Sequence, residues 1–120
     1  MSNANVIDLA GLRSKVGDDD AFTLEILGDM KEELAEGIVK MKMPLDASEL
    51  EYVASVAHCI KGSAAYVKAG VLNDVASRMN EACKRGDLEA SKGIFRELLA
   101  AQTVFIAELQ RISGENGPGL

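Results

Sequence analysis

Four long segments of this chain carry apolar residues at every third or fourth position. This spacing follows the 3.6-residue turn of an α-helix, so the apolar side chains of each segment share one face. We expect helices at residues 20–43, 48–67, 71–85 and 88–112. The sequence shows no strand pattern and no internal repeat. Long helices with short connections indicate an all-α fold, an antiparallel up-down-up-down four-helix bundle.

The residues between the first and second long helices are typical of helix ends. Pro44 is expected to stop the first long helix, because proline lacks the N–H that a helix interior needs. Ser48 with Glu51 fits a capping box at the start of the second helix, and Asp46 is the alternative cap. Later in the chain, Gly70 is expected to mark the break after the second long helix.

A short amphipathic helix is expected before the bundle, at residues 6–15, with Asp8 as its cap and Gly17 at its end. Gly86 and Asp87 form a compact turn in which the glycine ends one helix and the aspartate starts the next. We therefore expect one domain over residues 6–112. Residues 1–5 would be an extension or remnants of expression, and residues 113–120 a flexible tail.

The composition narrows the classes of function. The 120 residues carry a formal net charge of −6, which disfavours both nucleic acid and anionic membrane surfaces. No apolar run is long enough to span a membrane, and no secretory signal precedes the first helix. One histidine and two cysteines are too few ligands for a zinc site and fit a cytoplasmic protein with reduced thiols. We expect a monomer without a metal or cofactor of its own.

The only histidine, His58, lies beside the apolar stripe of the second long helix. Lys61 follows one turn later, close enough to share its surface patch. The helical neighbours of His58 are all small: Ala54, Ser55, Gly62 and Ala65. Glycine in a helix interior costs roughly 1 kcal/mol relative to alanine, so Gly62 breaks a local rule where no turn is needed. The stripe consists of Leu50, Val53, Ala57, Ile60, Ala64 and Val67.

The run from His58 through Lys61, Gly62, Ser63 and Ala64 resembles the signature of histidine-containing phosphotransfer (HPt) domains. These four-helix domains carry phosphoryl groups in two-component signal transduction. The resemblance implies that His58 accepts a phosphoryl group from a receiver-domain aspartate and passes it to another receiver aspartate. It also implies attachment at the imidazole nitrogen farther from the backbone. The chain has no phosphate loop, so we expect the partner receiver to supply the aspartate and Mg²⁺.

Four residues receive roles in this interpretation. His58 is the phosphoacceptor, and Lys61 neutralises part of the phosphoryl charge. Gly62 leaves clearance for an approaching receiver. Asn80 lies on the flank of the next helix, where relatives carry a polar residue, often Gln, that hydrogen-bonds the histidine. Because Asn is shorter, direct contact with His58 stays open. Ser63 points away from His58 and is expected to be structural.

The partners follow from the same resemblance. Response-regulator receiver domains are expected to dock on the small and apolar surface around His58, and a hybrid histidine kinase is a further candidate. Apolar contact should supply most of the affinity, because the domain and the phosphoryl group are both negative. The expected contact residues are Ala54, Ser55, Ala65, Leu9 and Leu12.

Three alternatives stay open. A lone histidine on a helix flank is commonly an ordinary surface residue, and Asn80 and Lys61 have the same alternative. The domain could be a helical adaptor without chemistry, or the phosphoacceptor domain of a chemotaxis-type histidine kinase. No autonomous kinase activity is expected in any of these cases. The sequence does not distinguish a free-standing protein from a domain of a hybrid kinase.

Overall fold

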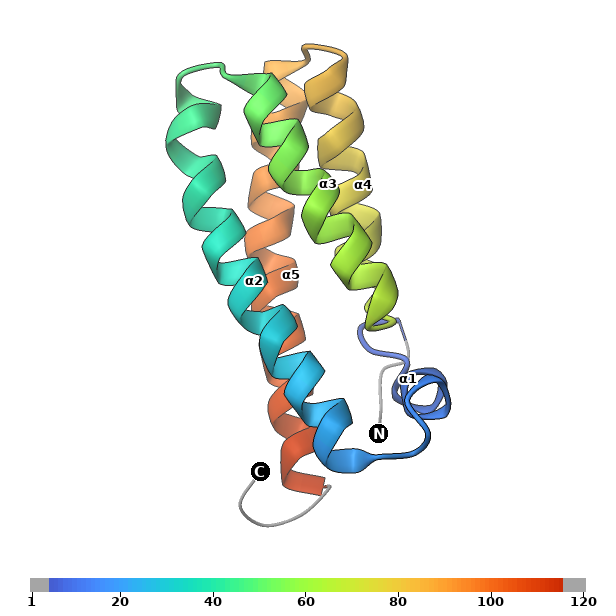
Figure 1. Ribbon diagram of the computed structural model, residues 1–120. Coiled ribbons are helices and arrows are strands. Elements are labelled where there is room, and N and C mark those ends of the chain that lie inside the picture. The colour runs from blue at the N-terminus through green and yellow to red at the C-terminus, as the bar shows by residue number, and fades with distance from the viewer. Residues whose placement is uncertain (1–4, 116–120) are drawn as a thin grey trace.

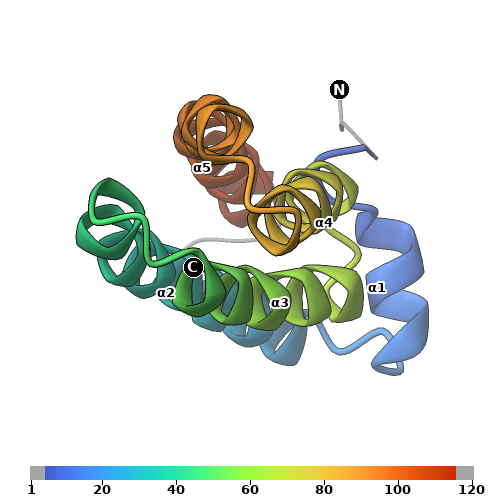
Figure 2. The same ribbon diagram turned by 90° about the horizontal axis from the view of Figure 1, so that it is seen from above.

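The computed structural model describes residues 5–115, and they form five helices. Figure 1 shows α2, α3, α4 and α5 running up and down side by side, with α1 across the end where α3 meets α4. Seen from above, the four long helices enclose one core (Figure 2). The body measures 44 × 22 × 21 Å. The predicted all-α bundle with a short N-terminal helix is confirmed. The helices are α1 (Leu9–Lys15), α2 (Asp20–Asp46), α3 (Leu50–Tyr66), α4 (Gly70–Lys84) and α5 (Leu88–Glu115).

The core is almost entirely aliphatic, as the low aromatic content requires. Phe105 of α5 is its largest fully buried side chain. The stripe expected on α3 is buried, since Val53, Ala57, Ile60 and Ala64 are at most 1% exposed. Burial of such side chains contributes roughly 1.5–3 kcal/mol each for the larger ones, so packing of one helix face fixes the orientation of α3.

The α2–α3 connection differs from the prediction. Pro44 lies inside α2, which continues to Asp46, because proline removes only its own N–H and the following Ala47 N–H still bonds to Met43. Leu45, 3% exposed, anchors this last turn in the core. Ser48 adopts a positive φ of 60° and is not a cap.

The cap of α3 is also not the one predicted. Glu49 occupies the N-cap position and makes no side-chain capping bond. Neither the Ser48–Glu51 capping box nor the Asp46 cap is therefore formed. Ser48 has a left-handed backbone conformation and reverses the chain directly after α2. An N-cap residue normally has an extended backbone, so Ser48 does not cap α3 in this conformation.

Other helix boundaries moved by a few residues. The first helix begins at Leu9, because Val6 and Ile7 extend into the core as buried residues. The break after α3 falls at Lys68, whose φ is 62°, and α4 starts at Gly70. The last helix runs on to 115, so residues 113 and 114 are helical and not part of a tail. The expected extension and tail otherwise lie outside the described residues, at 1–4 and 116–120.

Several end signals were predicted correctly. Asp8 accepts a hydrogen bond from the Gly11 N–H at 3.1 Å and caps α1. Asp87 does the same for α5, accepting from Ala90 N–H at 3.0 Å. Gly17 and Gly86 adopt φ values of 74° and 72°, which only glycine reaches without strain. Within residues 5–115, none of the helices has the length and hydropathy needed to cross a lipid bilayer.

Candidate functional site

His58 lies near the middle of α3 and its side chain is exposed. In Figure 2, α3 lies between α2 and α4. Because the stripe of α3 is buried and His58 is exposed, the histidine lies on the side of α3 that is open to solvent. A helix packed along its length on one face is a rigid support for a reactive group. The imidazole is therefore held on a fixed platform and is reachable by another protein.

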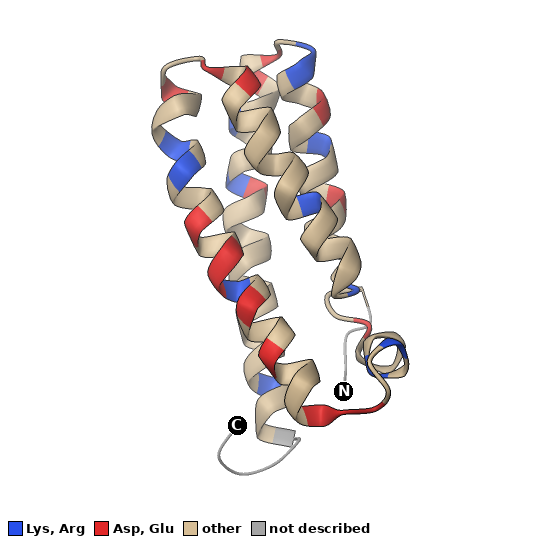
Figure 3. Cartoon of the chain, in the orientation of Figure 1, with Lys and Arg blue, Asp and Glu red and all other residues tan. Residues whose placement is uncertain are grey.

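The surface around His58 carries little charge. Between Tyr52 and Tyr66, Lys61 is the one Lys, Arg, Asp or Glu of α3 (Figure 3). Neighbouring α2 carries several acidic residues along the same stretch of the bundle. Lys61 is exposed, and no ion pair involves it among the described residues. Its ammonium charge is thus available to an anionic group near His58.

Gly62 is exposed on α3, one turn from His58. A Cβ built there would meet no atom within 4 Å. The fold therefore does not require glycine at this position. Intrinsic helix propensity disfavours it, so neither packing nor propensity accounts for Gly62.

Ser63 has a structural contact, as its predicted direction requires. Its hydroxyl lies 2.8 and 2.7 Å from the two carboxylate oxygens of Glu33 on α2. A shallow pocket of about 340 Å³ lies over this contact, between α2 and α3. Its lining includes Gly62 as well as Ile26 and Tyr66. The pocket extends the surface beside His58 toward α2.

Asn80 is not on an exposed flank. The side chain is 6% exposed, and its Nδ2 donates to the backbone carbonyl of Ala54 at 2.8 Å. No hydrogen bond joins Asn80 to His58 among the described residues. The sequence placed Asn80 on the flank of the apolar stripe of α4, because its angular offset from that stripe matches that of His58 from its own. That offset does not show how closely α3 and α4 approach.

The expected docking residues divide into two groups. Ser55 and Ala65 are exposed beside His58, and Leu9 is half-buried. The side chains of Ala54 and Leu12 are buried, at 6% and 0% exposure, and are not available to a partner. Leu12 was misjudged because the single apolar face of the short α1 packs into the bundle.

Sequence reasoning missed the exposed aromatic residues of α3. Tyr52 and Tyr66 are 46% and 50% exposed, and Cys59 next to His58 is an exposed free thiol. Tyr66 is fixed from one side by Lys15, whose Nζ lies 3.9 Å from the ring centroid. The signal was available, because both tyrosines fall outside the apolar stripe of the helix.

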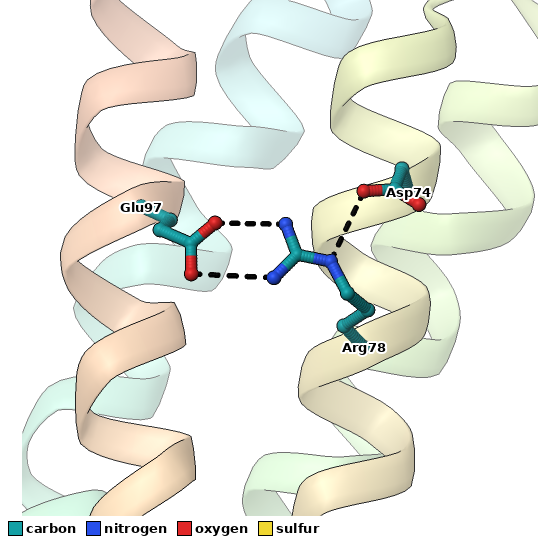
Figure 4. Close-up of polar contacts among 3 residues, drawn as sticks. All are labelled: Asp74, Arg78 and Glu97. Atoms are coloured by element: carbon teal, nitrogen blue, oxygen red, sulfur yellow. Dashed lines mark hydrogen bonds and ion pairs between the residues drawn. The ribbon is translucent and has the colours of Figure 1, made fainter.

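A larger groove of about 900 Å³ lies elsewhere, between α4, α5 and the N-terminal segment. Arg78 crosses it as an ion pair with Glu97 of α5 and Asp74 of its own helix, at 2.8 and 3.0 Å (Figure 4). Hydrogen bonds to Glu97 and then Asp74 raise the pKa of Arg78, and the same bond lowers the pKa of Glu97. His58 does not line this groove, so we place the candidate site on α3.

Metal ligands are not grouped in this domain. No cluster of three or more His, Cys, Asp or Glu side chains suited to a metal ion occurs within residues 5–115.

Comparison with known proteins identifies the family. Residues 25–114 match the family model described as "Hpt domain". The fold is similar to the crystal structure of the HPT domain from an Hpt sensor hybrid histidine kinase of Shewanella, with a TM-score of 0.78 and 17% identity over 94% of this chain and 97% of that one. No curated protein matches significantly. With most of its length covered by the family model, the chain belongs to the Hpt domain family, whose members take part in phosphotransfer in two-component signalling.

Proposed function

We propose that His58 is the phosphoacceptor of this domain and shuttles a phosphoryl group between receiver-domain aspartates. The observation that carries the proposal is the exposure of the only histidine on a rigid, nearly uncharged face of α3 in a member of the Hpt family. Neutral imidazole is a nucleophile near neutral pH, which suits it to accept a phosphoryl group and pass it on.

Each transfer forms one bond to phosphorus and breaks another, so atoms and electrons balance. The far ring nitrogen of His58 attacks the phosphorus of a receiver aspartyl phosphate, a P–N bond forms, and the P–O bond to aspartate breaks. The aspartate leaves as a carboxylate with the bonding electron pair, and the imidazole proton passes to solvent. The reverse steps deliver the phosphoryl group to a second aspartate. Charge on the transferred group is the main electrostatic cost, and Lys61, three residues after His58, would offset part of it.

The receiver supplies what this chain lacks. It brings the aspartate and a Mg²⁺ ion held by its own carboxylates, since the described residues offer no cluster for one. The surface of this domain on which the receiver docks would include Ser55 and Ala65, with the aromatic residues Tyr52 and Tyr66 as anchors at either end. These tyrosines are 14 positions apart on α3, which is about 21 Å along the helix axis.

A phosphotransfer assay tests the proposal. Incubation with a phosphorylated receiver and Mg²⁺ should yield a phosphoprotein that is labile in acid and stable in base, as a phosphohistidine is. Binding of the receiver without transfer would instead support a helical adaptor. Phosphorylation by an ATP-binding kinase domain, but by no receiver, would favour the chemotaxis-type phosphoacceptor.

An NMR titration with an unphosphorylated receiver tests the docking surface. We expect amide shifts around His58 and Ala65, and Ala65→Glu should weaken both acceptance and donation several-fold because it places a bulky charge in an apolar contact. Ser14→Glu on the exposed side of α1 is a control for added charge alone. Shifts limited to α5 would contradict this surface.

A further inference from the structure

Two asparagines of α4 bond to the backbone of α3 on either side of His58. Nδ2 of Asn80 donates to the carbonyl of Ala54 at 2.8 Å, and Nδ2 of Asn73 donates to the carbonyl of Lys61 at 3.0 Å. Both the donors and the acceptors are seven residues apart, or two helical turns. Because α3 and α4 are antiparallel, the later asparagine meets the earlier carbonyl. His58 lies in the segment of α3 between these two carbonyls.

Small residues allow this contact. Several buried residues of α3 and α4 are alanines, and the distance between packed helices depends on the size of the side chains between them. A short Asn side chain reaches across to a backbone carbonyl only where the helices approach closely. The buried alanines of these two helices are Ala54, Ala57, Ala64, Ala76 and Ala82.

The asparagine bonds are not needed to satisfy the carbonyls. In an α-helix the Ala54 carbonyl already accepts the His58 N–H, and the Lys61 carbonyl already accepts the Ala65 N–H. A carbonyl has two lone pairs, so each accepts a second bond from α4. The Ala54 carbonyl thus binds both the phosphoacceptor residue and the buried amide of Asn80.

We infer that Asn73 and Asn80 are positioning residues for His58. Packing of apolar stripes tolerates small rotations and shifts of one helix on another, whereas two directed hydrogen bonds two turns apart do not. Together they fix the rotation of α3 about its axis and its register on α4. They therefore fix the direction in which the imidazole leaves the bundle. This inference rests on the proposed function of His58.

The two bonds differ in weight. Asn80 is 6% exposed, so its bond lies in a medium of low dielectric and excludes competition from water. The Asn73 bond lies at the surface, where water competes. Loss of Asn80 should therefore have the larger effect, and loss of Asn73 a smaller effect in the same direction.

The test separates positioning from stability. Asn80→Leu keeps the branching and the number of side-chain heavy atoms, removes both polar ends and leaves no carbonyl without a partner. We expect near-normal thermal stability, about tenfold slower acceptance of phosphate, and a shifted imidazole resonance, since small misplacements of reacting groups reduce rates strongly. His58 is the only histidine, so its ring signals are assigned without ambiguity. Met79→Leu, at a buried position beside Asn80 on α4, is the packing control. It should leave the rate of phosphate acceptance and the imidazole resonance unchanged.

Asn73→Ala provides an independent arm at a position that is not buried. It should slow transfer about two- to threefold and shift the amide of Ala65, which shares the Lys61 carbonyl. If Asn80→Leu does not fold, this variant decides the matter. Wild-type transfer and unchanged His58 and Ala65 signals in the folded variants would overturn the inference. If the wild-type domain accepts no phosphate, the proposed function fails, and the NMR shifts still test the positioning.

Discussion

Gly37 of α2 and Gly62 of α3 both lie inside helices, but only one of them is required by packing. A Cβ on Gly37 would lie 2.6 Å from Cδ1 of Ile60, whereas a Cβ on Gly62 would meet nothing within 4 Å. Ile60 and Gly62 belong to the same helix. The side of α3 that bears Ile60 is therefore closely packed, and the side that bears Gly62 is open.

This difference teaches how to interpret a glycine in a helix. On the packed side, Ile60 fills the space that a side chain of Gly37 would occupy, so packing within the fold accounts for this glycine. On the open side, packing within the fold does not account for the missing side chain. Open space alone is not enough, since Gly28 of α2 also has no neighbour within 4 Å. What singles out Gly62 is its place one turn from the exposed His58.

Loss of the histidine should have the largest effect of any change on the open side. We expect His58→Gln to abolish phosphoryl acceptance, because no other imidazole exists in the chain. Stability should stay within about 0.5 kcal/mol of wild type, since the side chain is exposed. Phosphorylation is measured with a labelled phospho-receiver, and unfolding by circular dichroism.

Cys59→Ser is the matched control for this change, as it alters the next exposed residue of α3 without touching the imidazole. It should accept phosphate at the wild-type rate. Retained phosphorylation of the His58→Gln protein would place the phosphoacceptor elsewhere.

On the packed side, Gly37→Gln should destabilise the bundle by on the order of 3 kcal/mol. The new side chain would overlap Ile60 and bury an amide without a partner. Denaturant unfolding measures the change. The folded fraction should still accept phosphate, because the substitution lies away from the open face. A fully stable Gly37→Gln protein would show that α2 and α3 can separate at little cost.

The same substitution on the open side should give the opposite pattern. Gly62→Gln is expected to keep or slightly raise stability, since Gln is a better helix former than Gly. Transfer from a receiver should slow about tenfold, because a long side chain one turn from His58 crowds the partner. Comparing the two Gln variants in both assays gives the test its contrast. Equal transfer rates for Gly62→Gln and wild type would show that clearance is not the role of Gly62.

The sequence predicted what depends on periodicity. The stripe of α3 and the exposure of His58 follow from residue spacing within one helix, and both were correct. The roles of His58, Lys61 and Gly62 in phosphotransfer stay predictions. What the sequence missed depends on contacts between helices. Asn80 is buried because α4 lies close against α3, and no spacing within α4 reveals that distance.

The errors at helix ends have the same origin. Pro44 predicts a stop from local chemistry, but burial of Leu45 extends α2 past it. Leu12 lies on the apolar face of the short amphipathic α1. That face could contact either a partner or the core, and the docking of α1 decides the matter. The seven-residue interval from Asn73 to Asn80 is visible in the sequence, but both side chains bond to backbone carbonyls, which every residue has, so the interval alone does not reveal the contacts.

The smallest effect is expected from the ion pair of Arg78 and Glu97, which joins α4 to α5 at the surface. Its hydrogen bond lowers the pKa of Glu97 from the usual 4.5, so any stabilisation is present above that pH and is lost as the pH falls through the lowered value. Glu97→Gln should therefore be slightly less stable than wild type near neutral pH, and the difference should vanish in acid. Because Glu97 is exposed, salt should also remove the difference. Thermal unfolding from pH 7 down to pH 3, at low and high salt, measures both trends. If this exposed pair contributed as much as the packing at Gly37, the contrast between the two sides of α3 would not account for where the bundle derives its stability.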